Sequence, residues 1–344
     1  MQRQSGLALC AMALILSLAA IPAWGQVPAD IEAKLKQIGR VVDAPGTAKL
    51  YGPLLAKQSY AGVAFTRDQS YGPEPRNILD VAAPAEKSGG ARPVLIYAPG
   101  GVGNKKLDYP GGEPFYDNIL IVAVKNGMVG VNTERRAGAG LAWDGGAHDV
   151  AEAISWVHKN IERFGGDPNR IVIWGQSAGA NALSVYLSHP DLYPDGDIGV
   201  KAAVLMSGGY NLLPLRPKAP NGPVGPGDRG ATATAAAAPA ATATAAAAPA
   251  PRPQPVAPAV QLQRSSLPGL RALKIPLFVM AAELDPENIV ESSQILKAQL
   301  CDAGHCSKYQ VSKGESHISQ VMSVNTADTS VSGPVFAWIK TVER

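Results

Sequence analysis

The stretch Gly175-Gln176-Ser177-Ala178-Gly179 lies directly after the apolar run 171–174 and directly before a helix-like segment, 180–187. This order predicts a strand, a sharp turn and a helix, with Ser177 at the turn. A serine there holds its hydroxyl out of the sheet, where a general base can reach it. A side chain at Gly175 or Gly179 would collide with the strand and helix that cross at the turn. The five residues alone are a weak signal, but their flanking elements make Ser177 the candidate nucleophile.

Five apolar runs predict strands that are buried on both faces of a parallel sheet. Helix-like segments separate these runs, and the segment 148–164 places its apolar side chains on one core-facing stripe. We expect Asp117 to cap a further helix over 118–126. Alternating strands and helices predict the α/β class, with a mainly parallel, doubly wound sheet covered by helices on both faces. The five runs are 94–98, 128–132, 171–174, 202–206 and 277–281.

A serine nucleophile needs a base, and the base needs an acid that orients it. His317 comes just after the last predicted strand, 308–311, and loops after parallel strands meet at the sheet edge that carries Ser177. We therefore predict His317 as the base. The acid is expected after the preceding strand, where Asp285 is preferred and Glu283 is the alternative. Asp285 also has the position of a helix N-cap, a role compatible with orienting the base. The remaining histidines are His148, His158, His189 and His305.

Backbone amides are expected to stabilise the negative oxygen that develops on the substrate. The amide of Ala178, directly after the nucleophile, is one candidate. The amides of Gly101 and Val102, in the glycine-rich turn after the strand 94–98, are the others. A turn of this kind also suits phosphate, but the sequence GGVGNKK lacks the Gly-Lys-Ser/Thr ending of a P-loop. We therefore predict an oxyanion hole made by Gly101, Val102 and Ala178.

Residues 1–25 have the form of a cleaved secretory signal. A positive charge lies near the start, an apolar run covers 7–20, and small residues occupy the −3 and −1 positions before Gln26. A retained transmembrane anchor is the alternative, but Pro22 interrupts the run before the roughly 20 apolar residues that such a helix needs. We therefore expect an exported protein, periplasmic or secreted, with no membrane segment once the signal is removed.

Removal of the signal leaves two cysteines, Cys301 and Cys306. An exported chain enters an oxidising compartment, which favours a disulfide between them. A metal site is the alternative, but it would need further ligands and only His305 lies nearby. We therefore predict a Cys301–Cys306 disulfide.

The segment 214–262 departs from the alternation of strands and helices. Residues 231–240 have the sequence ATATAAAAPA, and residues 241–250 repeat it letter for letter. Each alanine block is too short to form a stable helix and ends in proline. Because the segment has almost no large apolar side chain, it cannot bury enough surface to fold. We expect an unstructured, low-complexity insertion in a single catalytic domain over 26–344.

Three stretches make the chain similar to bacterial carboxylesterases of the α/β-hydrolase superfamily. Two shorter phrases, YGP at 71–73 and LDV at 79–81, resemble the feruloyl-esterase-like branch of that superfamily. The three stretches are FYDN at 115–118, FGGDPNR at 164–170 and GQSAGA at 175–180.

This resemblance implies a serine esterase or lipase of the α/β-hydrolase fold that uses no cofactor. It implies Asp285 as the acid and His317 as the base. Many relatives have His-Gly-Gly where this chain has Pro99-Gly100-Gly101. Relatives also often carry a helical cap where this chain has its insertion, so we expect a reduced cap and a more open pocket.

The sequence as a whole favours an exported serine hydrolase that cleaves small carboxylic esters with short acyl or aromatic groups. A peptidase or polyester depolymerase with the same three residues is one alternative. A non-catalytic binding module on the same fold is another, because fold does not fix function. The formal net charge of +3 is too small and too dispersed for a nucleic-acid surface. No pattern in the chain predicts an oligomeric state.

Overall fold

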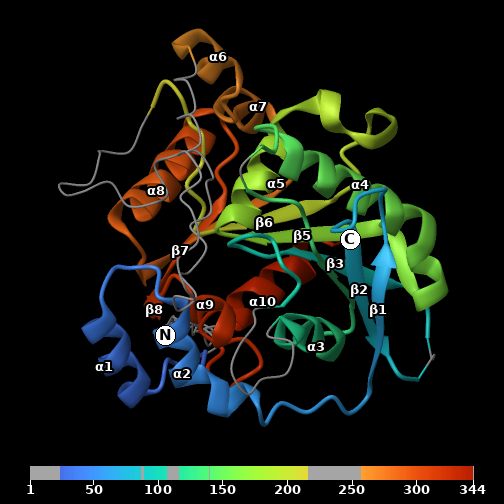
Figure 1. Ribbon diagram of the computed structural model, residues 1–344, viewed down its shortest axis with the longest axis vertical. Coiled ribbons are helices and arrows are strands. Elements are labelled where there is room, and N and C mark those ends of the chain that lie inside the picture. Colours follow the sequence, from blue (N-terminus) through green and yellow to red (C-terminus); the bar gives the residue numbers. More distant parts are fainter. Residues whose placement is uncertain (1–23, 87–88, 107–115, 139, 216–256, 344) are drawn as a thin grey trace, which may run out of the picture.

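A sheet of eight strands, in the order β1-β2-β4-β3-β5-β6-β7-β8, forms the centre of the described part of the protein (Figure 1). The computed structural model describes residues 24–86, 89–106, 116–138, 140–215 and 257–343. β2 is antiparallel to β1 and β4, and every other neighbouring pair is parallel. The predicted α/β class is therefore confirmed. The strands are β1 (Val63–Ser70), β2 (Ile78–Pro84), β3 (Arg92–Ala98), β4 (Val129–Thr133), β5 (Gly166–Gln176), β6 (Ala202–Met206), β7 (Leu277–Leu284) and β8 (Lys308–Ser316).

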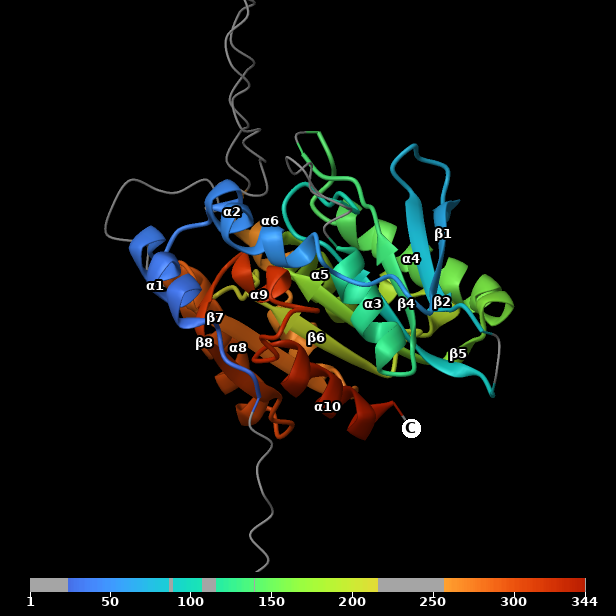
Figure 2. The ribbon, with the colours of Figure 1, turned by 90° about the horizontal axis from the view of Figure 1, so that it is seen from below.

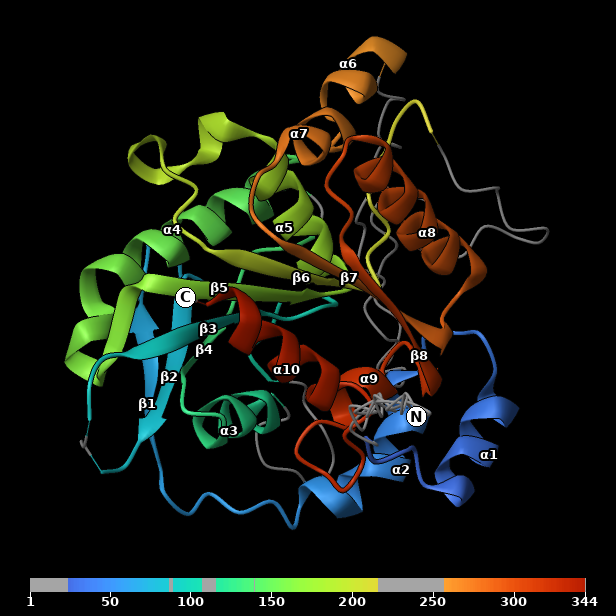
Figure 3. The ribbon, with the colours of Figure 1, turned by 180° about the vertical axis from the view of Figure 1, so that it is seen from behind.

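Helices cover both faces of the sheet (Figure 3). Side chains alternate along a strand, so Ile173 of β5 lies in one apolar core and Trp174 lies in the other. The helix predicted over 148–164 is α4 followed by a short 3₁₀ turn, and its apolar stripe is buried. The first core packs against α4 (Gly145–Asn160), α5 (Ala178–Ser188), α7 (Leu267–Ala272) and α8 (Glu287–Asp302). The second packs against α1 (Ala29–Ile38), α2 (Ala44–Leu55), α3 (Asp117–Lys125), α9 (Ser319–Met322) and α10 (Ser332–Val342).

Two N-terminal helices lie beside the end of the sheet that carries β8 (Figure 2). α1 contacts β8, and α2 contacts α9, the short helix that follows β8. α2 has little intrinsic helix preference, because it contains two prolines and two glycines. Its first turn is fixed by Asp43, whose side chain accepts a hydrogen bond from the amide of Gly46 at 2.9 Å, and its Tyr51 is fully buried. Packing rather than propensity therefore forms this helix.

The predicted capping role of Asp117 is wrong. α3 begins at Asp117 itself, and its cap, Tyr116, forms no side-chain capping hydrogen bond. The carboxylate of Asp117 instead accepts hydrogen bonds of 2.7 and 2.6 Å from the Arg67 guanidinium. It also accepts one of 3.0 Å from the Tyr60 hydroxyl. A guanidinium binds a carboxylate with two parallel hydrogen bonds, so this pairing prevails over a local cap.

The C-terminal end of the predicted insertion 214–262 is helical rather than unstructured. α6 (Pro258–Gln263) begins there and is followed by α7, which lies against α5. The approach is close, because a Cβ on Gly269 of α7 would collide with the backbone of Ser188 at the end of α5. The two repeated blocks, 231–250, lie outside the described residues.

Most of the predicted signal, residues 1–23, also lies outside the described part of the chain. Gly25 lies within it and exchanges backbone and side-chain hydrogen bonds with Thr329. Signal cleavage and export therefore stay predictions. Within the described residues, no helix is both long and apolar enough to cross a membrane.

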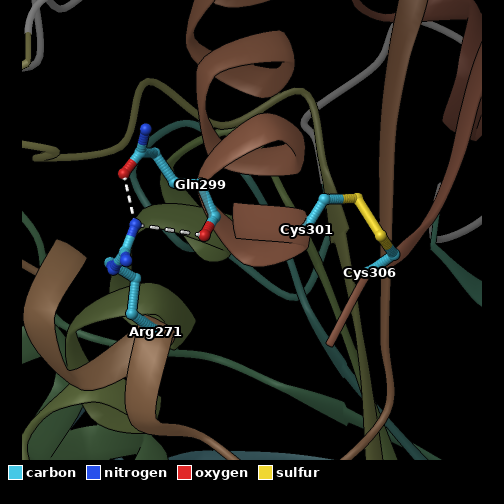
Figure 4. The surroundings of a disulfide bond; sticks show 4 residues. All are labelled: Arg271, Gln299, Cys301 and Cys306. Carbon is cyan, nitrogen blue, oxygen red and sulfur yellow. Dashed lines mark hydrogen bonds between the residues drawn. A yellow bond between two sulfur atoms is a disulfide. The ribbon is translucent and has the colours of Figure 1, made fainter. Parts of the chain in front are cut away.

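The predicted disulfide between Cys301 and Cys306 is present (Figure 4). It joins the last turn of α8 to the segment just before β8. Beside it, Arg271 of α7 donates a hydrogen bond of 2.6 Å to the Gln299 side chain of α8. His305 lies between the two cysteines and its Nε2 lies 2.7 Å from the carbonyl oxygen of Arg271. These contacts connect α7, α8 and the start of the strand that leads to His317.

Candidate active site

Ser177 occupies a strained turn between β5 and α5. Its φ of 52° and ψ of −121° lie in a region that L-residues rarely adopt. A Cβ on Gly175 would lie 2.5 Å from the Leu183 side chain, and one on Gly179 would collide with the carbonyl oxygen of Ala98. The predicted need for glycine at both positions is therefore confirmed. The turn places the Ser177 side chain at the carboxyl edge of the sheet.

The structure brings Ser177, His317 and Asp285 together. Nε2 of His317 lies 2.8 Å from Oγ of Ser177, and Nδ1 of His317 lies 2.6 Å from Oδ1 of Asp285. His317 directly follows β8, and Asp285 directly follows β7. β8 is longer than predicted and extends through Ser316, so the strand itself carries the chain up to the histidine. The imidazole is held between a hydroxyl and a carboxylate, the arrangement of a nucleophile, base and orienting acid.

Asp285 is held by two donors on the side away from the imidazole. Its Oδ2 accepts hydrogen bonds of 2.6 Å from the Ser207 hydroxyl and 2.7 Å from the Ala282 amide. The predicted additional N-cap role is wrong, because α8 begins after Pro286 with no side-chain capping hydrogen bond. The carboxylate turns back toward β7 instead. Both of its oxygens are thus directed by the surrounding structure, and the side chain is fully buried.

The alternative acid, Glu283, faces elsewhere. Its Oε2 accepts a hydrogen bond of 2.7 Å from the amide of Gly314 in β8. Gly314 has a φ of +73°, which favours glycine. Glu283 thereby joins β7 to β8, and Asp285 is the carboxylate that contacts His317.

Three buried polar residues that the sequence did not single out fix the position of His317. The Gln176 amide, directly before the nucleophile, donates a hydrogen bond of 3.1 Å to the His317 carbonyl oxygen. The Gln320 amide donates one of 2.6 Å to Oγ of Ser207, the residue whose hydroxyl binds Asp285. Ser207 directly follows β6 and has a φ of +52°, an unusual value for a residue other than glycine. Its place at a strand end is the signal that sequence reasoning passed over.

The other four histidines lie away from this group. The His158 and His305 rings contact backbone carbonyls, and His189 is hydrogen-bonded within the end of α5. His148 lies on the surface near Asp144.

The predicted oxyanion turn lies beside the nucleophile. A Cβ on Gly100 would lie 2.9 Å from Cβ of Ser177, so the oxyanion turn is in direct contact with the turn that carries Ser177. Gly101 has a φ of +55°, which turns the chain sharply after β3. Among the described residues, the amides of Gly101 and Val102 have no hydrogen-bond acceptor. Ala178 is the first residue of α5, where amides lack a partner within the helix.

A buried acidic pair lies behind the site. Glu315, two residues before His317, accepts a hydrogen bond from the Ser319 hydroxyl, and Ser330 lies between Glu315 and Asp328. Burial, with a smaller contribution from the Asp328 carboxylate, raises the pKa of Glu315 to about 8. The folded protein therefore retains a proton here that an exposed carboxyl releases near pH 4.5.

The raised pKa of Glu315 predicts that the free energy of unfolding falls as pH rises. Between about pH 4.5 and 8 the folded state binds more protons than the unfolded state, so the free energy of unfolding decreases by at most about 1.4 kcal/mol per pH unit. Glu315→Gln should flatten this dependence, because a neutral amide replaces the titrating group. Urea unfolding at pH 5, 6, 7 and 8 measures both slopes. Glu86→Gln, at an exposed site, should keep the wild-type slope; equal slopes for the wild type and Glu315→Gln would contradict the prediction.

Known proteins share the fold of this chain, and one family matches part of its sequence. The Carboxylesterase family model matches residues 77–215, which include Ser177 and the oxyanion turn. The bacterial heroin esterase has the same fold, with a TM-score of 0.64 and 19% identity over 93% of this chain and 99% of that chain. A complex of a C4–C4 tributyrin phosphonate with esterase B from Lactobacillus rhamnosis gives a TM-score of 0.60 and 13% identity, over 91% and 96% of the two chains. The protein therefore has the α/β-hydrolase fold.

Part of the chain is also similar in sequence to a curated esterase. The chain is 33% identical over 130 residues to fumonisin B1 esterase from Sphingopyxis macrogoltabida, which is 33% of this chain and 23% of that enzyme. The chain thus spans about a quarter of the length of this relative. The predicted α/β-hydrolase fold is confirmed, and residues 77–215 are similar to the Carboxylesterase family. The feruloyl-esterase-like branch stays a prediction.

Proposed function

We propose that this protein hydrolyses carboxylic esters through an acyl-enzyme on Ser177. The Ser177 hydroxyl attacks the acyl carbon while His317 takes its proton, and His317 returns that proton to the leaving alkoxide. Water then attacks the acyl-enzyme by the same route and releases the acid. Asp285 holds the imidazole in the tautomer that accepts a proton from Ser177. The amides of Gly101, Val102 and Ala178 stabilise the negative oxygen.

One observation carries this proposal. The chain of hydrogen bonds from Ser177 through His317 to Asp285, at 2.8 and 2.6 Å, joins residues that are 140 and 32 positions apart in the sequence. Each lies just after a different strand, so the fold itself assembles them at one edge. The Carboxylesterase match and the esterases of the same fold support the reaction class.

Within that class we propose short acyl or aromatic esters as substrates. The esterase B structure with a C4–C4 tributyrin phosphonate supports a short acyl group, since its fold is shared over most of both chains. Between β6 and β7, where relatives often carry a cap, the described residues form two short helices, α6 and α7.

A fluorophosphonate probe tests the proposal. The wild-type protein should form one covalent adduct, located on the peptide that contains Ser177 by mass spectrometry. Preincubation with p-nitrophenyl butyrate should slow the labelling. A panel of p-nitrophenyl, feruloyl and acetyl-sugar esters, with casein and a polyester film beside them, then identifies the substrate class. A folded protein that is neither labelled nor active on any member of the panel would leave a binding module as the better hypothesis.

A further inference from the structure

The carbonyl groups of the oxyanion turn, residues 99–103, are held by hydrogen bonds from outside the turn. The Arg135 guanidinium donates a hydrogen bond of 3.2 Å to the Pro99 oxygen, and the Arg135 amide donates one of 3.0 Å to the Gly103 oxygen. One residue thus holds both ends of the turn. Between them, the Gly103 amide donates to the Gly100 oxygen at 3.0 Å.

A second arginine holds the outer part of the same turn. Nη2 of Arg76 donates a hydrogen bond of 2.9 Å to the Val102 oxygen and also contacts the Asn104 side chain. Nε of Arg76 is paired with Glu134 at 2.9 Å, the residue directly before Arg135. The turn after β3 is therefore bound to the chain that follows β4.

Arg135 is an unusual residue to find in this place. It is 5% exposed and forms no ion pair with a carboxylate among the described residues. The nearby Asp149 is paired with the neighbouring Arg136 instead. Burial lowers the pKa of Arg135 to about 10, so the guanidinium is still charged at neutral pH. Burying a charge without an ion-pair partner is unfavourable, and among the described residues the guanidinium donates its hydrogen bond to the Pro99 oxygen.

The shape of the turn depends on this side chain. Gly103 has a φ of +75°, and a Cβ there would lie 2.6 Å from Cγ of Arg135. The arginine stem therefore fills the space beneath Gly103. In a trans peptide the N–H group points away from the preceding carbonyl. The hydrogen bonds to the Pro99 and Gly100 oxygens fix these two peptide planes, and with them the directions of the Gly100 and Gly101 amides.

We propose that Arg135, assisted by Arg76, is a positioning residue that holds the turn 99–103 in the conformation in which the Gly101 amide faces the oxyanion of the reaction. This inference rests on the proposed ester hydrolysis. Arg135 touches no substrate; it acts through the backbone of the turn. The hydrogen bonds of Arg135 also explain how a turn that begins with Pro99, where many relatives have histidine, is kept in a fixed conformation.

Arg135→Met tests the inference, because methionine fills the same space but donates no hydrogen bond. We expect kcat for p-nitrophenyl butyrate to fall about 10- to 100-fold with KM within threefold, since loss of a whole oxyanion donor lowers kcat about 10²- to 10³-fold. Inhibition by a trifluoromethyl ketone, which forms an oxyanion on the serine, should weaken by the same factor. The pH profile of kcat/KM should not move, because His317 is not touched. Arg135→Lys should recover part of the rate.

Two further variants keep the test decisive. Arg76→Met, at a partly exposed site, should lower kcat about 3- to 10-fold and decides the matter if Arg135→Met does not fold. Arg170→Met, which removes a guanidinium that binds the Ala91 carbonyl far from the turn, should leave kcat and inhibition unchanged. Unchanged kcat and inhibition in folded Arg135→Met would overturn the inference. If Arg135→Met does not fold, unchanged kcat and inhibition in Arg76→Met would overturn it. A wild-type protein without esterase activity or ketone binding would instead overturn the proposed function.

Discussion

Ser177→Ala and His317→Ala should each lower kcat for p-nitrophenyl butyrate by about 10⁶-fold, and the double variant should lose little more. The reason is that the two side chains act as one unit. Nε2 of His317 lies 2.8 Å from Oγ of Ser177, so the base has no proton to take without the serine, and the serine is a weak nucleophile without the base. The residual rate should come from the oxyanion hole and from substrate binding.

Steady-state kinetics with active-site titration measure this loss and exclude traces of the wild-type enzyme. His158→Ala is the matched control, because its ring contacts the carbonyl of Gly199 on the surface and takes no part in the site. The control should keep the wild-type kcat. Losses in the two single variants that multiply in the double variant would show that Ser177 and His317 act independently. A Ser177→Ala variant with a tenth of the wild-type rate would mean that the nucleophile lies elsewhere.

The parts of the site that could be predicted from sequence are those set by local geometry or by the topology of a parallel sheet. Ser177 was predictable because the flanking glycines are required within a few residues of it. His317 and Asp285 were predictable because the loops after parallel strands meet at one edge. Neither inference needs knowledge of which distant side chains touch.

The parts that were missed depend on contacts between distant segments. Ser207 binds Asp285 across 78 positions, and Arg135 binds Pro99 across 36. A serine or an arginine is common, so its sequence position alone does not mark it. The cap expected from Asp117 failed for the same reason, because Arg67 is 50 positions away and binds it more strongly than the local backbone does.

The end of β8 shows how buried polar groups change a strand boundary. Residues 312–316, SKGES, have the composition of a loop, yet the strand continues through them. Gly314 donates to Glu283 of the neighbouring strand, and the Glu315 carboxyl is satisfied by the Ser319 and Ser330 hydroxyls. Because these groups have partners inside the protein, the polar segment is buried except at Lys313, and it delivers His317 from a rigid strand rather than from a loose loop.

Asp285→Asn should lower kcat by about 10⁴-fold while the fold stays intact. The surroundings of Asp285 determine how an asparagine would sit. The Ala282 amide can only donate to this position, and the Ser207 hydroxyl, which accepts from Gln320, donates to the same oxygen in the wild type. These donors select the amide oxygen of the asparagine, so its NH₂ group faces Nδ1 of His317. The imidazole then accepts at Nδ1 and carries its proton on Nε2, where it cannot take one from Ser177.

Glu283→Gln is the control for this variant, since Glu283 is the carboxylate near the end of β7 and it binds the amide of Gly314 rather than the imidazole. A glutamine oxygen can still accept that hydrogen bond, so kcat should stay within about threefold of the wild type. The rate of fluorophosphonate labelling should follow kcat in both variants, because phosphonylation needs the same proton transfer. Thermal unfolding should show that both proteins are folded at the assay temperature. A large loss in Glu283→Gln with a nearly active Asp285→Asn would assign the orienting role to Glu283 and would contradict the hydrogen bond of 2.6 Å between Asp285 and His317 as the working contact.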